Sequence, residues 1–170
     1  MSAAPVTSPL STRHAIAADA AAIAEIYNAG IDDRVATFET RHRAPADIEA
    51  WFDGVHPVVV VEQDGEIVGF ASTSTYRPRE CYAGIAEYSV YVARDARGRG
   101  VGRAAMLALF DAARESGFWK LISRIFPENA SSLRLMRSLG FREVGTYVRH
   151  GKLDGEWRDV VIVEKLLDEG

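Results

Sequence analysis

A glycine-rich segment between a predicted strand and a predicted helix constrains this chain more than any other feature. Residues 85–92 are rich in β-branched and aromatic side chains, which is typical of a strand. From Gly102 to about Ser116, apolar residues recur at helical spacing. Between them, residues 97–102 read Arg-Gly-Arg-Gly-Val-Gly. Glycines let the backbone come close to a ligand, and the start of a helix leaves unpaired N–H groups that suit phosphate oxygens.

The glycine pattern excludes two common phosphate-binding motifs. The dinucleotide-binding fingerprint needs a third glycine where this chain has Arg103, and the Walker loop needs a Gly-Lys-Ser/Thr ending that does not occur here. What remains is Arg-x-x-Gly-x-Gly, formed by Arg97, Gly100 and Gly102 directly after the predicted strand. We interpret the segment as a phosphate-binding loop. The alternative is a tight turn that carries solvated arginines.

Size and composition predict one domain that does not bind nucleic acid or a membrane. A chain of 170 residues, 48% of them apolar, can bury a core, and its net charge of −4 disfavours nucleic acid. No apolar stretch approaches the ~20 residues of a membrane span. The single Cys81 suits a reducing compartment, so a cytoplasmic location is expected. The histidines lack metal-ligand spacing, so no metal is expected. Residues 1–11 are expected to form a flexible tail and residues 12–170 the domain.

The hydrophobic pattern predicts several strands joined by short turns and four helices. Asp19 is expected to cap a helix that ends near Ala29, and Gly140 is expected to end the last helix. Strand signals are runs of β-branched and aromatic residues between turn residues. The expected strands are 12–16, 58–61, 67–75, 85–92, 119–125, 141–148 and 157–166, with hairpin turns at Asp64-Gly65 and Asp154-Gly155; the other helices start at Pro45, Gly102 and Asn129.

Together these features resemble the GNAT superfamily of acetyl-CoA-dependent N-acetyltransferases. The resemblance rests on the Arg-x-x-Gly-x-Gly loop after a strand, on Asn129 and on Leu139-Gly140-Phe141, and it covers roughly residues 11–167. It implies an α/β (α+β) fold with a mixed, mostly antiparallel sheet of about seven strands and about four helices. It also implies acetyl-CoA as the cosubstrate.

The resemblance assigns a set of residues to the cofactor. Backbone N–H groups of the loop would bind the pyrophosphate, and the loop arginines would add positive charge. The main chain of the strand before the loop would pair with the pantetheine arm. Asn129 would hold the same arm while serving as a helix N-cap. The residues expected to bind the cofactor are Val90, Val92, Arg97, Gly98, Arg99, Gly100, Val101, Gly102, Asn129 and Ser132.

Glu87 is the candidate general base. Its neighbours Ala86, Tyr88 and Val90 predict a strand buried on at least one face, where a carboxylate needs a partner or becomes easier to protonate. Either outcome suits a group that removes a proton from an ammonium. The phosphinothricin-type acetyltransferases carry Val-Glu-x-x-Val-Tyr-Val here, and this chain has Ala-Glu-Tyr-Ser-Val-Tyr-Val. The alternative is a structural salt bridge to Arg77 or Arg124.

One catalytic role has no candidate in the sequence. Many related enzymes place a tyrosine or a histidine seven residues after the asparagine, to protonate the leaving thiolate. In this chain that position is Met136, which donates no proton. Cys81 as a nucleophile is a weak alternative, because no local signature supports an acyl-enzyme route.

A further resemblance, to the phosphinothricin and methionine sulfoximine acetyltransferases, narrows the range of expected substrates. Residues 26–30, 36–40 and 76–78 carry this likeness, and residues 119–129 and 152–160 look most like the arsinothricin-resistance N-acetyltransferases. These substrates are glutamate mimics with two negative groups, so the pocket should contain arginine. Arg77 is the first candidate, ahead of Arg124 and Arg79, and Tyr76, Thr37 and Phe38 would complete the pocket.

The resemblance also leaves alternatives open. It implies a homodimer in which both subunits approach the substrate. The same fold acetylates protein N-termini, lysines, polyamines and aminoglycosides, and cationic acceptors of that kind would need an acidic pocket. A domain that binds acyl-CoA without catalysis and regulates a partner is the other alternative, and it would fit the methionine at position 136.

Overall fold

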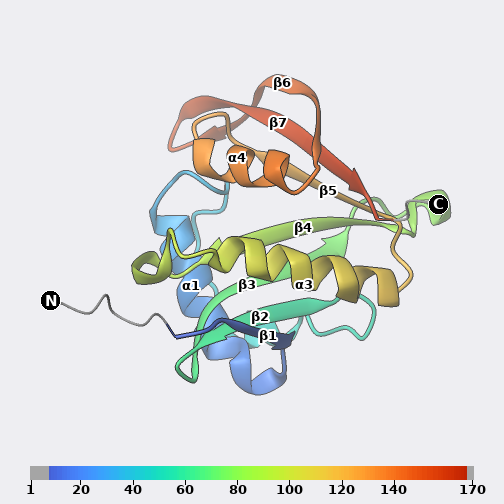
Figure 1. Cartoon of the computed structure of the whole chain (residues 1–170). Coiled ribbons are helices and arrows are strands. Elements are labelled where there is room, and N and C mark those ends of the chain that lie inside the picture. Colours follow the sequence, from blue (N-terminus) through green and yellow to red (C-terminus); the bar gives the residue numbers. More distant parts are fainter. Residues whose placement is uncertain (1–7, 168–170) are drawn as a thin grey trace, which may run out of the picture.

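The computed structural model describes residues 8–167, and these fold around one seven-stranded sheet (Figure 1). The strand order is β1-β2-β3-β4-β5-β7-β6, and within this range only β4 and β5 pair in parallel. The predicted fold class is therefore confirmed. The strands are β1 (Ser11–His14), β2 (Val58–Gln63), β3 (Glu66–Thr75), β4 (Ile85–Val92), β5 (Lys120–Ile125), β6 (Arg142–Leu153) and β7 (Glu156–Leu166), and the helices are α1 (Ala20–Asp32), α2 (Pro45–Glu49), α3 (Val101–Glu115) and α4 (Ala130–Ser138).

Helices cover both faces of the sheet, because successive side chains of a strand point to opposite faces. In β2, Val59 and Val61 belong to the core cluster that includes residues of α3 and α4. Val58 and Val60 belong to the second cluster, which includes residues of α1 and α2. Figure 1 shows α3 and α4 in front of the sheet. The sheet is thus the middle of three layers.

The predicted turns are confirmed by their backbone angles. Asp64 and Gly65 have φ of 53° and 79°, and Asp154 and Gly155 have φ of 51° and 81°. Left-handed angles at both central residues belong to the hairpin turn that favours Asp-Gly. Gly140, which follows the end of α4, has φ of 88°, as expected for a glycine that ends a helix.

The N-terminal segment differs from the prediction. The Asp19 carboxylate does not cap α1, but accepts the Ile16 N–H at 2.8 Å and two N–H groups of Arg13 at 2.7 and 2.9 Å. A 3-10 turn over Ala17–Asp19 precedes the helix, so this carboxylate closes the turn instead. Of the predicted tail, residues 1–7 lie outside the described residues, and Ser11 is the first residue of β1.

Strand β6 continues past its predicted end at Val148. Its pairing with β7 is interrupted after Tyr147 and resumes with Gly151 opposite Arg158. Arg149, inside this irregularity, has φ of 50°, and its N–H donates to the Asp159 carboxylate at 2.8 Å. A bulge breaks the period-2 pattern on which the strand prediction rests, which explains why the pattern ends the strand too early.

The feature that positions the site is the separation of β4 from β5. The two strands pair only from Ile85 to Glu87, opposite Lys120 to Ile122. Just beyond this ladder, the Ser123 hydroxyl donates to the Tyr88 carbonyl at 2.9 Å. The second half of β4 therefore borders an opening in the middle of the sheet.

Candidate active site

A cleft of about 410 Å³ lies beside the second half of β4. Its walls come from β4, from the glycine loop with the start of α3, from the N-terminus of α4, and from the end of α1 with the residues after it. All but one of the residues expected to bind the cofactor line this cleft; these are Val90, Val92, Arg97, Gly98, Gly100, Val101, Gly102, Asn129 and Ser132.

The glycine loop has the backbone that a phosphate site needs. Gly98 and Gly100 have φ of 77° and 82°, and a side chain at either position would meet no neighbour within 4 Å. It is the left-handed backbone that requires glycine there, and lack of space is not the reason. At Gly102 space does matter, because a Cβ would lie 3.1 Å from Leu135 Cδ2. Gly100 is the N-cap of α3 and offers no side chain, so the first N–H groups of the helix remain available to an anion.

The two loop arginines point to different partners. The Arg97 guanidinium donates to Asp33 Oδ2 at 2.7 Å at the mouth of the cleft. Arg99 is the expected cofactor residue that does not line the cleft, because it donates to Gln63 Oε1 at 3.2 Å and to the Asp95 carbonyl at 2.7 Å. Arg97 is thus the arginine of the loop that faces the cleft.

Asp33, which the sequence did not single out, fastens the end of α1 to the loop. Besides Arg97, its carboxylate accepts Arg94 Nη2 at 2.8 Å, and Arg94 also donates to the Ala29 carbonyl at 3.1 Å. Hydrogen bonds from Arg97 and then Arg94 lower the pKa of Asp33. Asp33 precedes these arginines by more than 60 positions, so no local pattern could have identified it.

Asn129 caps α4 as predicted. Its side-chain oxygen accepts the Ser132 N–H at 3.3 Å, and both residues line the cleft. Within residues 8–167 its amide nitrogen makes no hydrogen bond, so it can donate to a ligand. The cap leaves one side of the amide free to face the cleft.

A second, smaller pocket of about 90 Å³ contains the proposed base. Glu87 of β4 is joined there by Tyr76 and Arg77, as predicted, and by Arg124 of β5. Four further residues complete the lining, namely Ile122, Tyr147, His150 and Ile162. Tyr147 and His150 stack with ring centroids 4.5 Å apart; they lie at the bulge of β6, which hid them from the sequence pattern.

The carboxylate of Glu87 is paired with Arg124. Arg124 Nε lies 3.0 Å from Oε1, and the second contact, from Nη2 to Oε2, is longer at 3.4 Å. The Glu87 side chain is 26% exposed, so it is reachable from solvent. Of the two salt-bridge partners considered from the sequence, the structure has Arg124. Arg77 instead lies over the Tyr76 ring, 4.7 Å from its centroid.

Comparison with known proteins assigns the chain to a family. The model of the Acetyltransferase (GNAT) family matches residues 23–141. The chain belongs to the GNAT acetyltransferases. It is 35% identical over 163 residues to an L-methionine sulfoximine/L-methionine sulfone acetyltransferase of Pseudomonas aeruginosa, covering 93% of this chain and 95% of that protein. It is 32% identical over 170 residues to phosphinothricin N-acetyltransferase of Streptomyces coelicolor, covering 96% and 99%.

A solved structure extends the likeness to the cosubstrate. YncA from Salmonella typhimurium, determined with its cofactor acetyl-CoA, matches with a TM-score of 0.89 and 33% identity over 95% of each chain. The predicted family and the predicted enzyme class are confirmed: this protein is an N-acetyltransferase that uses acetyl-CoA. The glycine loop, the free N-terminus of α3 and the cleft volume fit a ligand of that kind.

Two predicted pocket residues of the acetyltransferase lie elsewhere. Phe38 packs edge-on against Phe126, with ring centroids 4.8 Å apart, and a Cβ on Gly151 would come within 2.9 Å of its ring. The Thr37 hydroxyl accepts the Glu39 N–H at 3.1 Å. Neither residue lines the pocket of Glu87, because their loop packs toward the β6–β7 hairpin.

Met136 and Cys81 line neither the cofactor cleft nor the pocket of Glu87. Met136 is 1% exposed in the core cluster beneath α4, and Cys81 is exposed. In the part of the chain that the structure describes, no three His, Cys, Asp or Glu side chains are grouped as they would be around a metal ion. In the same range, no helix combines the length and apolarity of a membrane span.

Proposed function

We propose that this acetyltransferase acetylates the α-amino group of glutamate-mimic amino acids, namely phosphinothricin, methionine sulfoximine and arsinothricin, and so confers resistance to them. The observation that carries the proposal is the pocket in which Arg77 and Arg124 flank Glu87. Such substrates present a carboxylate and a second polar or anionic group, which arginine binds best. The names of the relatives support the same substrate class.

Glu87 acts as the general base in this proposal. An amino-acid ammonium has to lose a proton before its nitrogen attacks the thioester carbonyl, and a carboxylate in hydrogen-bond reach can accept that proton. Arg124 holds Oε1 closely, whereas its contact with Oε2 is longer. Oε2 is therefore the oxygen that accepts the proton. An anionic group of the substrate would also compete with Glu87 for Arg124.

Acetyl-CoA occupies the larger cleft in this proposal. The loop from Arg97 to Gly102 binds the pyrophosphate through backbone N–H groups, and Arg97 adds its charge. The main chain of Val90 and Val92 and the amide of Asn129 hold the pantetheine arm. Support comes from their common position on one cleft that adjoins β4, the strand that also carries Glu87.

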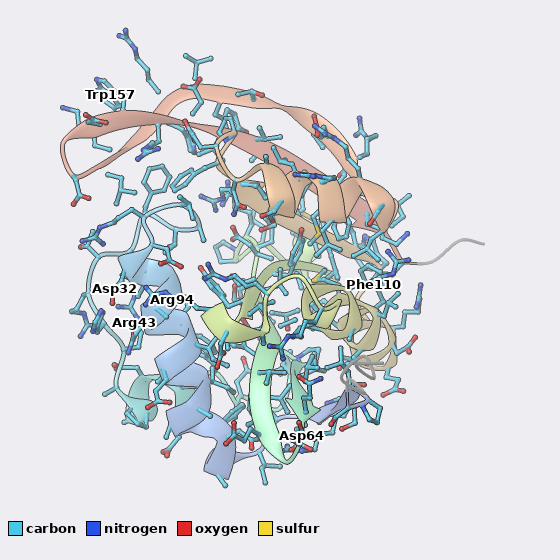
Figure 2. The ribbon with its side chains drawn as sticks, turned by 60° about the vertical axis from the view of Figure 1, so that its left-hand side comes forward. Asp32, Arg43, Asp64, Arg94, Phe110 and Trp157 are labelled. Atoms are coloured by element: carbon cyan, nitrogen blue, oxygen red, sulfur yellow. The ribbon has the colours of Figure 1, made fainter. Side chains whose placement is uncertain are left out.

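The proposal includes a homodimer in the cytoplasm. Strand β6 is an edge strand that is exposed along nearly its whole length, and Val144, Tyr147 and Val148 are 47%, 54% and 72% exposed. Trp157 on β7 is 54% exposed beside it (Figure 2). Long apolar edges are usually covered. Sedimentation equilibrium would give twice the monomer mass; a monomer at micromolar concentration would contradict the dimer.

The lone Cys81 supports a reducing compartment.

Thiol release from acetyl-CoA, measured with a panel of acceptors, tests the substrate class. The panel contains phosphinothricin, methionine sulfoximine, arsinothricin, glutamate, spermidine and an aminoglycoside. We expect turnover with the glutamate mimics alone. Turnover confined to spermidine or the aminoglycoside would keep the enzyme class and overturn the substrate class. Acetyl-CoA binding without turnover of any acceptor would favour the regulatory alternative.

A further inference from the structure

Acetyl transfer leaves a negative charge on the sulfur of CoA. Many related enzymes place a proton donor for this sulfur at the position that is Met136 in this chain. This side chain cannot donate a hydrogen bond. A group that stabilises the charge as it develops has to be a donor already fixed near the thioester. Such a donor has to lie near the opening between β4 and β5, on the face where Met136 is buried.

Tyr88 lies at this opening. It is the first residue of β4 beyond the ladder with β5, and its carbonyl accepts the Ser123 hydroxyl at 2.9 Å. Tyr88 and Ser123 line a pocket of about 60 Å³ together with Val90 and Ser132, both of which also line the cofactor cleft. Tyr88 therefore lines a small pocket that shares Val90 and Ser132 with the cofactor cleft.

The side chain of Tyr88 shares the face of Met136. Ala86 and Tyr88 belong to the core cluster that includes Met136 and Phe141, whereas Glu87 points to the opposite face. The ring of Tyr88 lies 5.2 Å from that of Phe141, centroid to centroid, and the residue is 3% exposed. The sheet thus presents Glu87 on one side and Tyr88 on the other.

The hydroxyl of Tyr88 has no hydrogen-bond partner within residues 8–167. Buried hydroxyl groups are normally paired, so an unpaired one in a native core needs an explanation. Phenylalanine would fill the same space without leaving a polar atom unsatisfied. A free donor on a residue that lines a pocket sharing Val90 and Ser132 with the cofactor cleft is explained if its acceptor arrives with the substrate.

We propose that the Tyr88 hydroxyl donates a hydrogen bond to the CoA sulfur as the thioester breaks. The acceptor nitrogen bonds to the carbonyl carbon, the C–S bond breaks, and its electron pair goes to sulfur. The proton of the amine goes to the base. Tyr88 keeps its own proton, and the thiolate takes one from water after it leaves the site. Tyr88 thus performs, from β4, the role for which the residue on α4 is unsuited.

The surroundings of the hydroxyl favour a donor that does not ionise. Burial raises the pKa of the Tyr88 hydroxyl well above its usual value. The hydroxyl therefore stays protonated at neutral pH. It acts by hydrogen bonding in a site from which water is largely excluded, where such a bond is strong.

Replacing Tyr88 by phenylalanine tests the proposal. Single-turnover thiol release with Y88F should slow by about a hundredfold, the lower end of the range for losing one donor to a developing anion. The KM for acetyl-CoA and the thermal midpoint should stay as in the wild type. Y27F is the matched control, because Tyr27 is a half-buried tyrosine of α1 that packs on the opposite face, and its rate should not change.

A second variant separates donation from packing. Met136→His places a donor at the position on α4, so the double variant Y88F/M136H should recover much of the lost rate. An Y88F rate within twofold of the wild type would overturn the proposal. So would a slow Y88F that is also destabilised, or a folded double variant no faster than Y88F. Any acceptor that the enzyme turns over serves here, so a failure of the proposed substrate class remains distinguishable.

Discussion

The cofactor cleft and the acceptor pocket of this enzyme are built in different ways. The cleft is the larger, at about 410 against 90 Å³, and most of its wall comes from two continuous stretches, residues 90–103 and 129–135. The pocket takes one or two residues from each of five separate places, the loop after β3 and strands β4, β5, β6 and β7. The first site offers the backbone N–H groups at the start of α3, and the second brings together three charged side chains, Arg77, Glu87 and Arg124.

This difference suits the two tasks of the enzyme, which are to bind the cofactor and to select the acceptor. Backbone N–H groups at the start of α3 are present whatever side chains surround them, so a phosphate site of this kind tolerates sequence change. A pocket formed by Arg77, Arg124 and Glu87 changes its ligand when one charge changes. We therefore expect substitutions in the cleft to alter the KM for acetyl-CoA, and substitutions in the pocket to alter turnover or the choice of acceptor.

Glu87→Gln should have the largest effect. The amide keeps the size of the side chain but cannot accept the proton, so kcat should fall by about 10²–10⁴-fold. The KM for acetyl-CoA should change little, because Glu87 does not line the cofactor cleft. Thiol release measures both quantities. Glu66→Gln, an exposed position at the start of β3, is the control. Unchanged turnover in E87Q would show that Glu87 is not the base and that this pocket does not contribute to proton transfer.

Gly100→Ala should affect the cleft alone. Alanine in the left-handed region costs about 1–2 kcal/mol, so the loop should leave its binding conformation and the KM for acetyl-CoA should rise by about tenfold. Gly54 is a matched control: its φ is 75° against 82° for Gly100, and a Cβ meets nothing within 4 Å at either position. G54A should lose similar stability in urea without a change in KM. Equal KM values in the two variants would show that the loop conformation does not matter for binding.

Arg77→Gln should weaken the binding of acceptors that carry a negatively charged side chain. Arg77 is exposed, so its contact with an anionic group is worth about 0.2–1 kcal/mol, up to about fivefold in KM for phosphinothricin. Methionine sulfone, whose side chain carries no charge, should be unaffected. Arg79, which lies over Tyr82 outside the pocket, is the control. An equal loss for both substrates would mean that Arg77 binds the α-carboxylate instead.

The same contrast explains what could be predicted from the sequence. The strand, loop and helix around Gly100 form one continuous stretch, and nearly every cofactor residue expected from it lines the cleft. The acceptor pocket is formed by segments that are distant in the sequence, so no local pattern indicates Tyr147 and His150. For the same reason the sequence does not show that Phe38 packs on Phe126 and lies outside this pocket. Periodicity identifies elements, but it does not reveal which loops meet.

Asp33→Asn should have the smallest effect and tests how the cleft wall is held. The folded protein lowers the pKa of Asp33, so its charge stabilises the fold above the unfolded value of about 3.9, and this contribution is lost as pH falls through the lower folded value. For a partly exposed pair, D33N should lose about 0.2–1 kcal/mol in urea at neutral pH.

The gap between wild type and D33N should then close in acid. Urea midpoints at neutral pH and at pH values that fall well below the unfolded pKa of about 3.9 would measure it. Asp111→Asn is the control, because Asp111 is 77% exposed and pairs with Arg114 on the surface of α3, so no gap is expected at either pH. A D33N gap that persists in acid would mean that shape, and not the charge pairing with Arg97 and Arg94, holds the end of α1 against the loop. Packing would then hold the wall of the cofactor cleft in place, and charged side chains would matter for the acceptor pocket but not for this wall.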